Sequence, residues 1–66
     1  MSVNQTEVIS RLKLLEFAYD CAVCYDKVPS YAEFNGSEEE YEKIAEFEGM
    51  DEGELISEIM KEIKNL

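Results

Sequence analysis

The sequence predicts an all-α fold, a small three-helix bundle, and three observations lead to this prediction. Apolar residues recur at helical spacing in three segments, capping-box pairs precede these segments, and strand-like alternation appears nowhere over a useful length. One Pro and three Gly among 66 residues leave room for long helices. We expect a single acidic helical domain over residues 1–66, with a long helix at about 4–26, a short turn at about 31–35, and helices at about 38–48 and 52–65.

The first expected helix is unusually apolar. Asn4 and Glu7 stand at capping-box spacing at its start. Two adjoining faces carry its apolar residues: Val8, Leu12, Leu15, Tyr19, Ala22 and Val23 on one, and Leu14, Phe17, Ala18, Cys21 and Tyr25 on the other. A helix that is apolar over most of its circumference is normally buried. Two further short helices can hardly cover it, so a homodimer or a partner along this helix is expected.

The connector after this helix contains the chain's only proline. Pro29 favours an extended conformation at Val28 and ends the first helical region. Ser30 and Glu33 repeat the capping-box spacing, which predicts one helical turn with Tyr31 and Phe34 in the core.

Two capped helices follow. Ser37 with Glu40, and Asp51 with Glu54, form the second and third helix starts. Gly49 suits the left-handed position just past the second helix. The expected apolar positions are Tyr41, Ile44, Ala45 and Phe47 in the second helix and Leu55, Ile56, Ile59, Met60, Ile63 and Leu66 in the third.

Negative charge is concentrated in the second half of the chain. The net charge is −10, and residues 33–62 hold twelve of the sixteen carboxylates against Lys43 and Lys61 only. A charge of this sign opposes contact with nucleic acid or anionic lipid, and no run of apolar residues is long enough to span a membrane. A basic protein is therefore the expected partner.

The glutamates are spaced as two ladders at i, i+4 and i+8. With the acids at the start of the third helix, they give the predicted partner-binding residues: Glu38, Glu42, Glu46, Asp51, Glu52, Glu54, Glu58 and Glu62. Spaced rows of carboxylates resemble the phosphate rows of a duplex, so they favour the basic channel of a nucleic-acid-binding enzyme or complex. The alternative is that these residues only solvate helices, because glutamate is a good helix former.

Residues 41–59 resemble a helix-turn-helix motif. Ala45, Gly49 and Leu55 occupy its small, turn-glycine and apolar positions. The resemblance departs at Glu58, where the motif has an apolar residue, and the would-be recognition helix is acidic. Direct DNA binding is not expected, because phosphates would repel this helix.

Residues suited to catalysis or metal binding are scarce. Cys21 and Cys24 form a CxxC without any His, so the pair is interpreted as two small buried apolar residues in a reducing compartment, with a helical disulfide or a metal shared in a dimer as alternatives. No glycine is placed as an EF-hand loop requires. No nucleophile stands beside a plausible base. We therefore expect neither an enzyme nor a cofactor.

Two functional hypotheses follow. The first is an inhibitor that blocks a basic nucleic-acid-binding surface with its carboxylates, as a nucleic-acid mimic in the cytoplasm of a bacterial or host cell. In size and charge the chain resembles the class of small anti-restriction and anti-CRISPR proteins of phages, a resemblance of class and not of motif. The second is a small dimeric interaction module or regulator that binds through the apolar face of its first helix.

Overall fold

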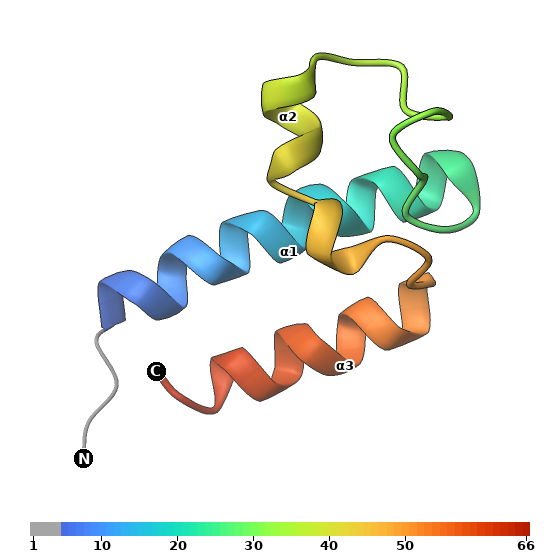
Figure 1. Ribbon diagram of the computed structural model, residues 1–66. Helices are drawn as coiled ribbons and strands as arrows, with labels where there is room; N and C mark the ends of the chain where they lie inside the picture. Colours follow the sequence, from blue (N-terminus) through green and yellow to red (C-terminus); the bar gives the residue numbers. More distant parts are fainter. Residues whose placement is uncertain (1–4) are drawn as a thin grey trace.

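The computed structural model describes residues 5–66 and confirms the all-α prediction (Figure 1). Its elements are α1 (Gln5–Tyr25), α2 (Glu38–Glu42), the short 3-10 helix η1 (Ala45–Phe47) and α3 (Glu52–Ile63), with no strand in this range. α1 and α3 lie side by side and run in opposite directions, so the C-terminus lies beside the first turns of α1 (Figure 1). The predicted cap at Asn4 lies outside the described residues.

The connector is fastened to the loop before α3. α1 ends at Tyr25, four residues before Pro29, because Asp26 adopts a left-handed backbone with φ 78°. The Val28 N–H then donates to the Met50 carbonyl at 3.0 Å, and the Val28 carbonyl accepts from the Gly49 N–H at 2.9 Å. This paired contact places the buried Val28 side chain in the core.

The expected turn after Pro29 is present, but only one of its two aromatic residues enters the core. The N–H groups of Glu33 and Phe34 both donate to the Ser30 carbonyl at 3.0 Å. Phe34 packs against the core, whereas Tyr31 is 56% exposed. The prediction of a core position for Tyr31 was wrong, because its ring lies over the outer side of Tyr41, with 5.4 Å between ring centroids.

The second helix is much shorter than the predicted 38–48 span. The α-helix ends at Glu42, and η1 follows after a turn at residues 43–44. Tyr41, Ile44 and Phe47 are all buried and stand three residues apart. An α-helix would rotate such positions away from a common line, whereas three residues per turn keeps them aligned. Consistent with this, Ile44, Phe47 and Met50 each donate their N–H to the carbonyl three residues earlier.

The third helix matches its prediction closely at its start. Asp51 caps α3, with Glu54 completing the capping box, and Gly49 has the expected left-handed φ of 83°. α3 ends at Ile63, two residues before the predicted limit, with a turn at residues 64–65.

A single cluster of buried residues joins all these elements. It comprises Leu15, Ala18, Cys21 and Ala22 of α1, Val28 of the connector, Tyr41 and Ile44, Phe47 of η1 and Leu55 of α3. The expected burial of the α3 stripe was wrong for four of its six residues, since Ile56, Met60, Ile63 and Leu66 are 43–58% exposed. α3 packs mainly against α1, so its outer residues are left uncovered.

Candidate protein-binding surface

The carboxylates predicted to bind a partner divide into three groups with different surroundings. Some are held by a cation of the same chain, some cap helices, and some make neither kind of contact. The distinction matters because a carboxylate already paired within the chain offers less to a basic partner.

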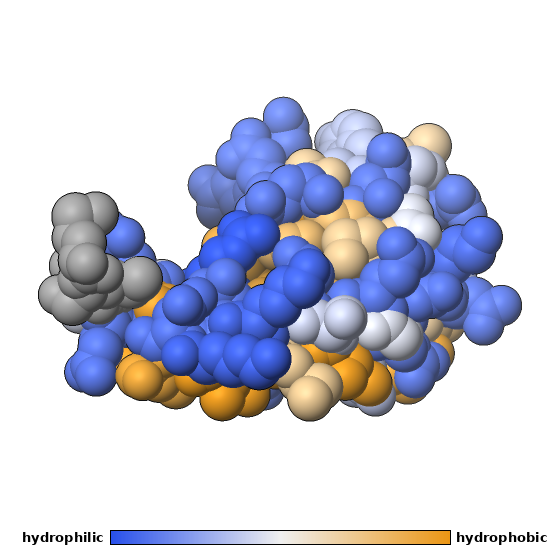
Figure 2. Space-filling model, turned by 90° about the horizontal axis from the view of Figure 1, so that it is seen from below, coloured by the Kyte–Doolittle hydropathy of each residue, from blue (hydrophilic) through white to orange (hydrophobic). Residues whose placement is uncertain are grey.

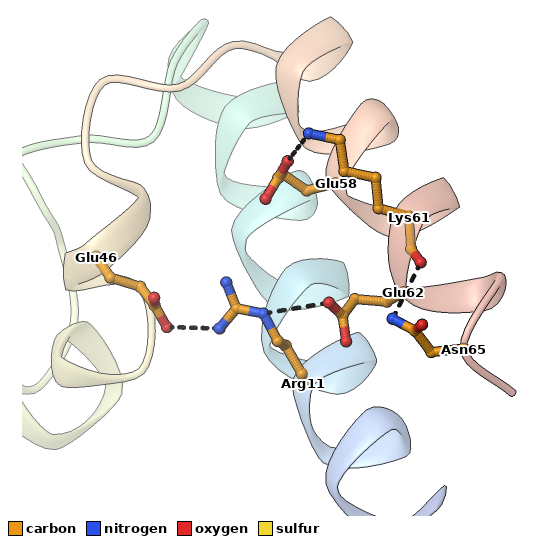
Figure 3. A network of polar contacts seen from close by, with 6 residues as sticks. All are labelled: Arg11, Glu46, Glu58, Lys61, Glu62 and Asn65. Atoms are coloured by element: carbon orange, nitrogen blue, oxygen red, sulfur yellow. Dashed lines mark hydrogen bonds and ion pairs between the residues drawn. The ribbon is translucent and has the colours of Figure 1, made fainter. Parts of the chain in front are cut away.

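Arg11 of α1 holds two of the predicted residues (Figure 3). Its Nη1 lies 3.2 Å from Glu46 Oε1, and its Nε lies 3.7 Å from Glu62 Oε2. The guanidinium also lies over the Phe47 ring, 5.4 Å from its centroid. Glu46 is therefore paired with α1, although its side chain is 54% exposed, and it does not continue a helical row with the glutamates of α2. The predicted second-helix ladder is interrupted where the helix ends.

A second ion pair lies along α3. Lys61 Nζ donates to Glu58 Oε2 at 3.1 Å, as Figure 3 also shows. The Lys61 carbonyl accepts from the Asn65 amide nitrogen at 3.3 Å. Two of the three glutamates spaced at i, i+4 and i+8 on α3, Glu58 and Glu62, thus have a cation beside them and are only partly exposed.

Two more predicted residues cap α3. The Glu54 N–H donates to Asp51 Oδ1 at 2.9 Å, and the Asp51 N–H donates to Glu54 Oε1 at 3.3 Å. Both side chains are exposed at the start of the helix, where negative charge is favoured by the helix dipole. Their first role is structural, because they satisfy backbone N–H groups that would otherwise have no partner.

The same arrangement starts α2. Ser37 Oγ accepts from the Glu40 N–H at 3.2 Å, and Glu40 Oε1 accepts from the Ser37 N–H at 3.2 Å and from its hydroxyl at 3.0 Å. These hydrogen bonds from the Ser37 backbone and side chain lower the pKa of Glu40 below its ordinary value. Glu40 is exposed, but its carboxylate is already engaged by the cap.

Within the described part of the chain, the remaining predicted residues take part in neither an ion pair nor a helix cap. Glu38, Glu42 and Glu52 are exposed, and no ion pair or side-chain hydrogen bond joins them to another described residue. Glu39 shares this environment and was missed, because only i, i+4 spacing was considered. Its position two residues before the buried Tyr41, on nearly the opposite side of the helix, is the signal that identifies it. We name Glu38, Glu39 and Glu42 the α2 acidic face.

Tyr41 of α2 belongs to a cluster of aromatic rings. The Phe34 ring lies 5.6 Å from that of Tyr41 and 6.4 Å from that of Tyr25, centroid to centroid. The Tyr41 hydroxyl donates to Glu48 Oε1 at 3.2 Å, and burial together with this carboxylate raises the pKa of Tyr41. Gly36 passes so close to Phe34 that a Cβ there would stand 2.6 Å from the ring. The packing of these aromatic rings thus fixes the position of α2, which carries the acidic face.

Other kinds of site were sought in residues 5–66. No group of three or more Cys, Asp or Glu side chains in this range is arranged to hold a metal ion. None of the described helices is long and apolar enough to cross a membrane. Cys21 is buried and Cys24 is exposed, and both thiols are free, so the expectation of two buried cysteines is met only by Cys21.

The helix-turn-helix resemblance does not extend to the backbone. Residues 41–59 comprise the last residues of α2, a turn, η1, a loop and the first two turns of α3. Two regular helices joined by one turn are not formed there. Comparisons with protein families, with curated proteins and with solved structures gave no match to this chain.

Proposed function

We propose that this protein is a small acidic inhibitor that binds a basic, nucleic-acid-binding surface of a target protein through its α2 acidic face. The observation that carries the proposal is the contrast among its carboxylates. Glu46, Glu58 and Glu62 form ion pairs with cations of the same chain, whereas Glu38 and Glu42 are exposed and form none with the described residues. A row of unpaired carboxylates on a supported helix is suited to arginine and lysine side chains.

The spacing of these carboxylates supports nucleic-acid mimicry. Glu38 and Glu42 lie four residues apart on one helix, about 6 Å along its axis at 1.5 Å per residue. A duplex strand carries one phosphate per about 3.4 Å of axis, so the two glutamates match alternate phosphates in separation along the axis. Glu39 adds a third charge between them, displaced around the helix. A basic channel that tracks a phosphate row would meet comparable charges here.

The remaining predicted residues take supporting parts in this proposal. Asp51, Glu52 and Glu54 at the start of α3 extend the negative field toward the target and raise the rate of encounter. Arg11 holds Glu46 and Glu62 beside α1, which confines the densest unpaired charge to α2. The protein would act in the cytoplasm of a bacterial or host cell, where such targets occur.

The alternative is an interaction module that binds through the apolar face of its first helix. Exposed Ile9 and Val23 on α1, which are 47% and 56% exposed, favour this alternative. The two hypotheses predict opposite responses to salt. Binding by carboxylates weakens as salt rises, whereas binding by apolar side chains does not.

Affinity capture with competition tests the proposal. The full chain is immobilised and exposed to a bacterial lysate at about 50 mM and 200 mM salt, a range over which phosphate-like contacts weaken strongly. We expect nucleic-acid-binding proteins to be captured at low salt and released by added duplex DNA. The captured target is then titrated with two variants of equal charge change.

The first variant, Glu38→Gln/Glu42→Gln, removes two charges from the α2 acidic face. The second, Glu7→Gln/Asp26→Asn, removes two charges from exposed positions near the start of α1 and just after its end, and serves as the control. Two exposed charge pairs together contribute about 0.4–2 kcal/mol, so the first variant should bind about 2–30-fold more weakly. Equal affinities of the two variants, or a captured target that duplex DNA does not displace, would refute the proposal.

A further inference from the structure

We infer that a second copy of this chain covers the apolar band on the open side of α1 and α3. The band consists of exposed Ile9 on α1 and Ile56, Met60, Ile63 and Leu66 on and after α3. Figure 2 shows apolar residues gathered along one edge of the molecule, with hydrophilic residues over the middle of the view. This inference is independent of the α2 acidic face.

The two helices contribute to the same side of the molecule. Arg11 bridges Glu46 of η1 and Glu62 of α3, so these three residues mark the side of the α1–α3 seam that faces η1. Ile9 is turned about 160° from Arg11 around α1, and Ile63 is turned about 100° from Glu62 around α3, at 100° per residue. Both therefore lie on the side of the seam away from η1, while Leu15 and Leu55 fill the seam itself.

The register of the two helices determines how far the band extends along each of them. α1 and α3 run in opposite directions with Arg11 and Glu62 at one level. Ile9 then lies at the level of residues 63–64, two residues beyond this pair on both helices. Val23 lies at the level of residue 50, beyond the start of α3, and exposed Glu16 and Asp20 stand between Ile9 and Val23 on the same face of α1. On α3, Ile56, Met60 and Ile63 follow one another at i, i+4 and i+7, as in the apolar seam of a helix pair. The apolar band therefore runs along α3, with Ile9 of α1 beside its C-terminal end and Val23 apart from it.

The charges beside the band identify the occupant as another copy of the same acidic chain. Lys13 and Lys64 stand there against Glu16, Asp20 and Glu52, a net charge of −1 out of −10 for the chain. A strongly basic partner would meet the two lysines here as well as the three carboxylates. An acidic copy meets its least repulsion here, and the two lysines of each copy can face the carboxylates of the other.

The shape of the molecule also favours self-association. Its principal extents are 40 × 24 × 14 Å, so it is a thin slab in which α2 and η1 cover only one side of α1 and α3. Scattered apolar residues are normal on a protein surface, but a contiguous strip such as that of Ile56, Met60 and Ile63 with Ile9 is typical of an interface. Two copies related by a two-fold axis would bring their helix pairs together as a four-helix bundle, in which both copies use the same surface.

Sedimentation equilibrium of the full chain tests this inference. The measurement is made with a thiol reductant, so that exposed Cys24 cannot cross-link two copies. We expect a dimer at tens of micromolar, and the dimer should tighten as salt rises because screening weakens the repulsion between two anionic copies. This response is opposite to that expected for a partner bound by the α2 acidic face, so the two proposals fail separately.

Two variants locate the interface. Met60→Gln/Ile63→Gln replaces exposed band residues without adding charge and should raise the dimer dissociation constant at least about tenfold, because each change occurs twice in a symmetric dimer. Tyr31→Gln is the control, since Tyr31 is 56% exposed but lies on the connector. A wild-type chain that stays monomeric at hundreds of micromolar would overturn the inference. So would a double variant that dimerises as well as Tyr31→Gln does.

Discussion

Arg11 decides which carboxylates remain available on this protein. It is one of six cations facing sixteen carboxylates, yet it contacts two of them and also lies over the Phe47 ring. Its side chain is 37% exposed, so its ion pairs are only partly screened by water. The three contacts tie α1 to η1 and α3 at one point, and they leave Glu46 and Glu62 already paired within the chain.

The two cysteines should differ sharply in reactivity. Cys21 is buried, and burial, followed by the nearby Cys24 and carboxylates, raises the pKa of its thiol. Cys24 is exposed. An alkylating reagent at neutral pH should therefore add one equivalent to the native protein, at Cys24, and two to the denatured protein. Peptide mass spectrometry gives the site, and rapid native labelling of Cys21 would contradict the buried position.

Glu40 should contribute stability only above the acidic range. Hydrogen bonds from the backbone and side chain of Ser37 lower the pKa of Glu40 in the folded chain. A lowered folded pKa means that the contribution is present above the ordinary glutamate pKa and is lost as the pH falls through the folded pKa. Glu40→Gln should therefore lower the Tm at pH 7, and its difference from the wild type should shrink as the pH falls through the acidic range.

The control for this experiment is Glu39→Gln. It removes the same charge from the same turn, but Glu39 does not take part in the Ser37 capping box. Its Tm difference from the wild type should be the smaller of the two at pH 7. A Glu40→Gln difference that persists undiminished at acidic pH would show that the lost stability does not come from the charged carboxylate.

At the scale of elements, the segment from Tyr41 to Met50 shows how burial overrides helix propensity. Its buried residues recur every three positions, and its hydrogen bonds join residues three apart. The glutamates between them favour an α-helix, but an α-helix would turn either Tyr41 or Phe47 away from α1. The chain instead forms α2, a turn and η1, and the Val28–Gly49 and Val28–Met50 hydrogen bonds fix the end of this segment.

Replacing Gly49, in the loop before Asp51, or Gly53, in α3, by alanine should have opposite effects on the stability of the fold. Gly49 has φ 83°, so Gly49→Ala should destabilise the fold by about 1–2 kcal/mol even though open space surrounds its Cβ position. Gly53 lies within α3, and a Cβ there would meet only Asp51 Oδ1 at 3.4 Å. Gly53→Ala should stabilise by up to about 1 kcal/mol. Urea unfolding of both variants measures the two changes, and the same sign for both would refute this assignment of backbone roles.

The sequence predicted those elements that local interactions determine. Both capping boxes, at Ser37 and Asp51, formed as expected because their partners lie three residues apart. The end of α2 was not predictable in this way, because it depends on packing against α1 and on hydrogen bonds to Val28. The candidate site divides similarly. Glu38 and Glu42 were identified from spacing, whereas the pairing of Glu46 depends on Arg11, thirty-five positions earlier.

The whole molecule combines a small core with strong self-repulsion. A chain of this size buries only about 60% of the surface exposed in its unfolded state, so its stability is modest. Four like-charge pairs stand at i, i+4 in its helices: Glu16/Asp20, Glu38/Glu42, Glu54/Glu58 and Glu58/Glu62. Such pairs cost about 0.2–0.5 kcal/mol each. This repulsion is a property of the free chain that a basic partner would relieve.

Salt should therefore stabilise the free chain. Screening of about 1–2 kcal/mol of repulsion corresponds to a Tm rise of roughly 4–16 °C for a domain of this size between low and moderate ionic strength. The Tm is measured at each salt concentration in the Met60→Gln/Ile63→Gln variant, so that self-association does not contribute. Within that background, Glu38→Gln should reduce the salt-dependent rise because it removes a repulsive pair. Arg11→Gln should enlarge it, because Glu46 and Glu62 lose their shared cation. A Tm that falls with salt would mean that ion pairs, and not repulsion among carboxylates, dominate the electrostatics of the folded chain.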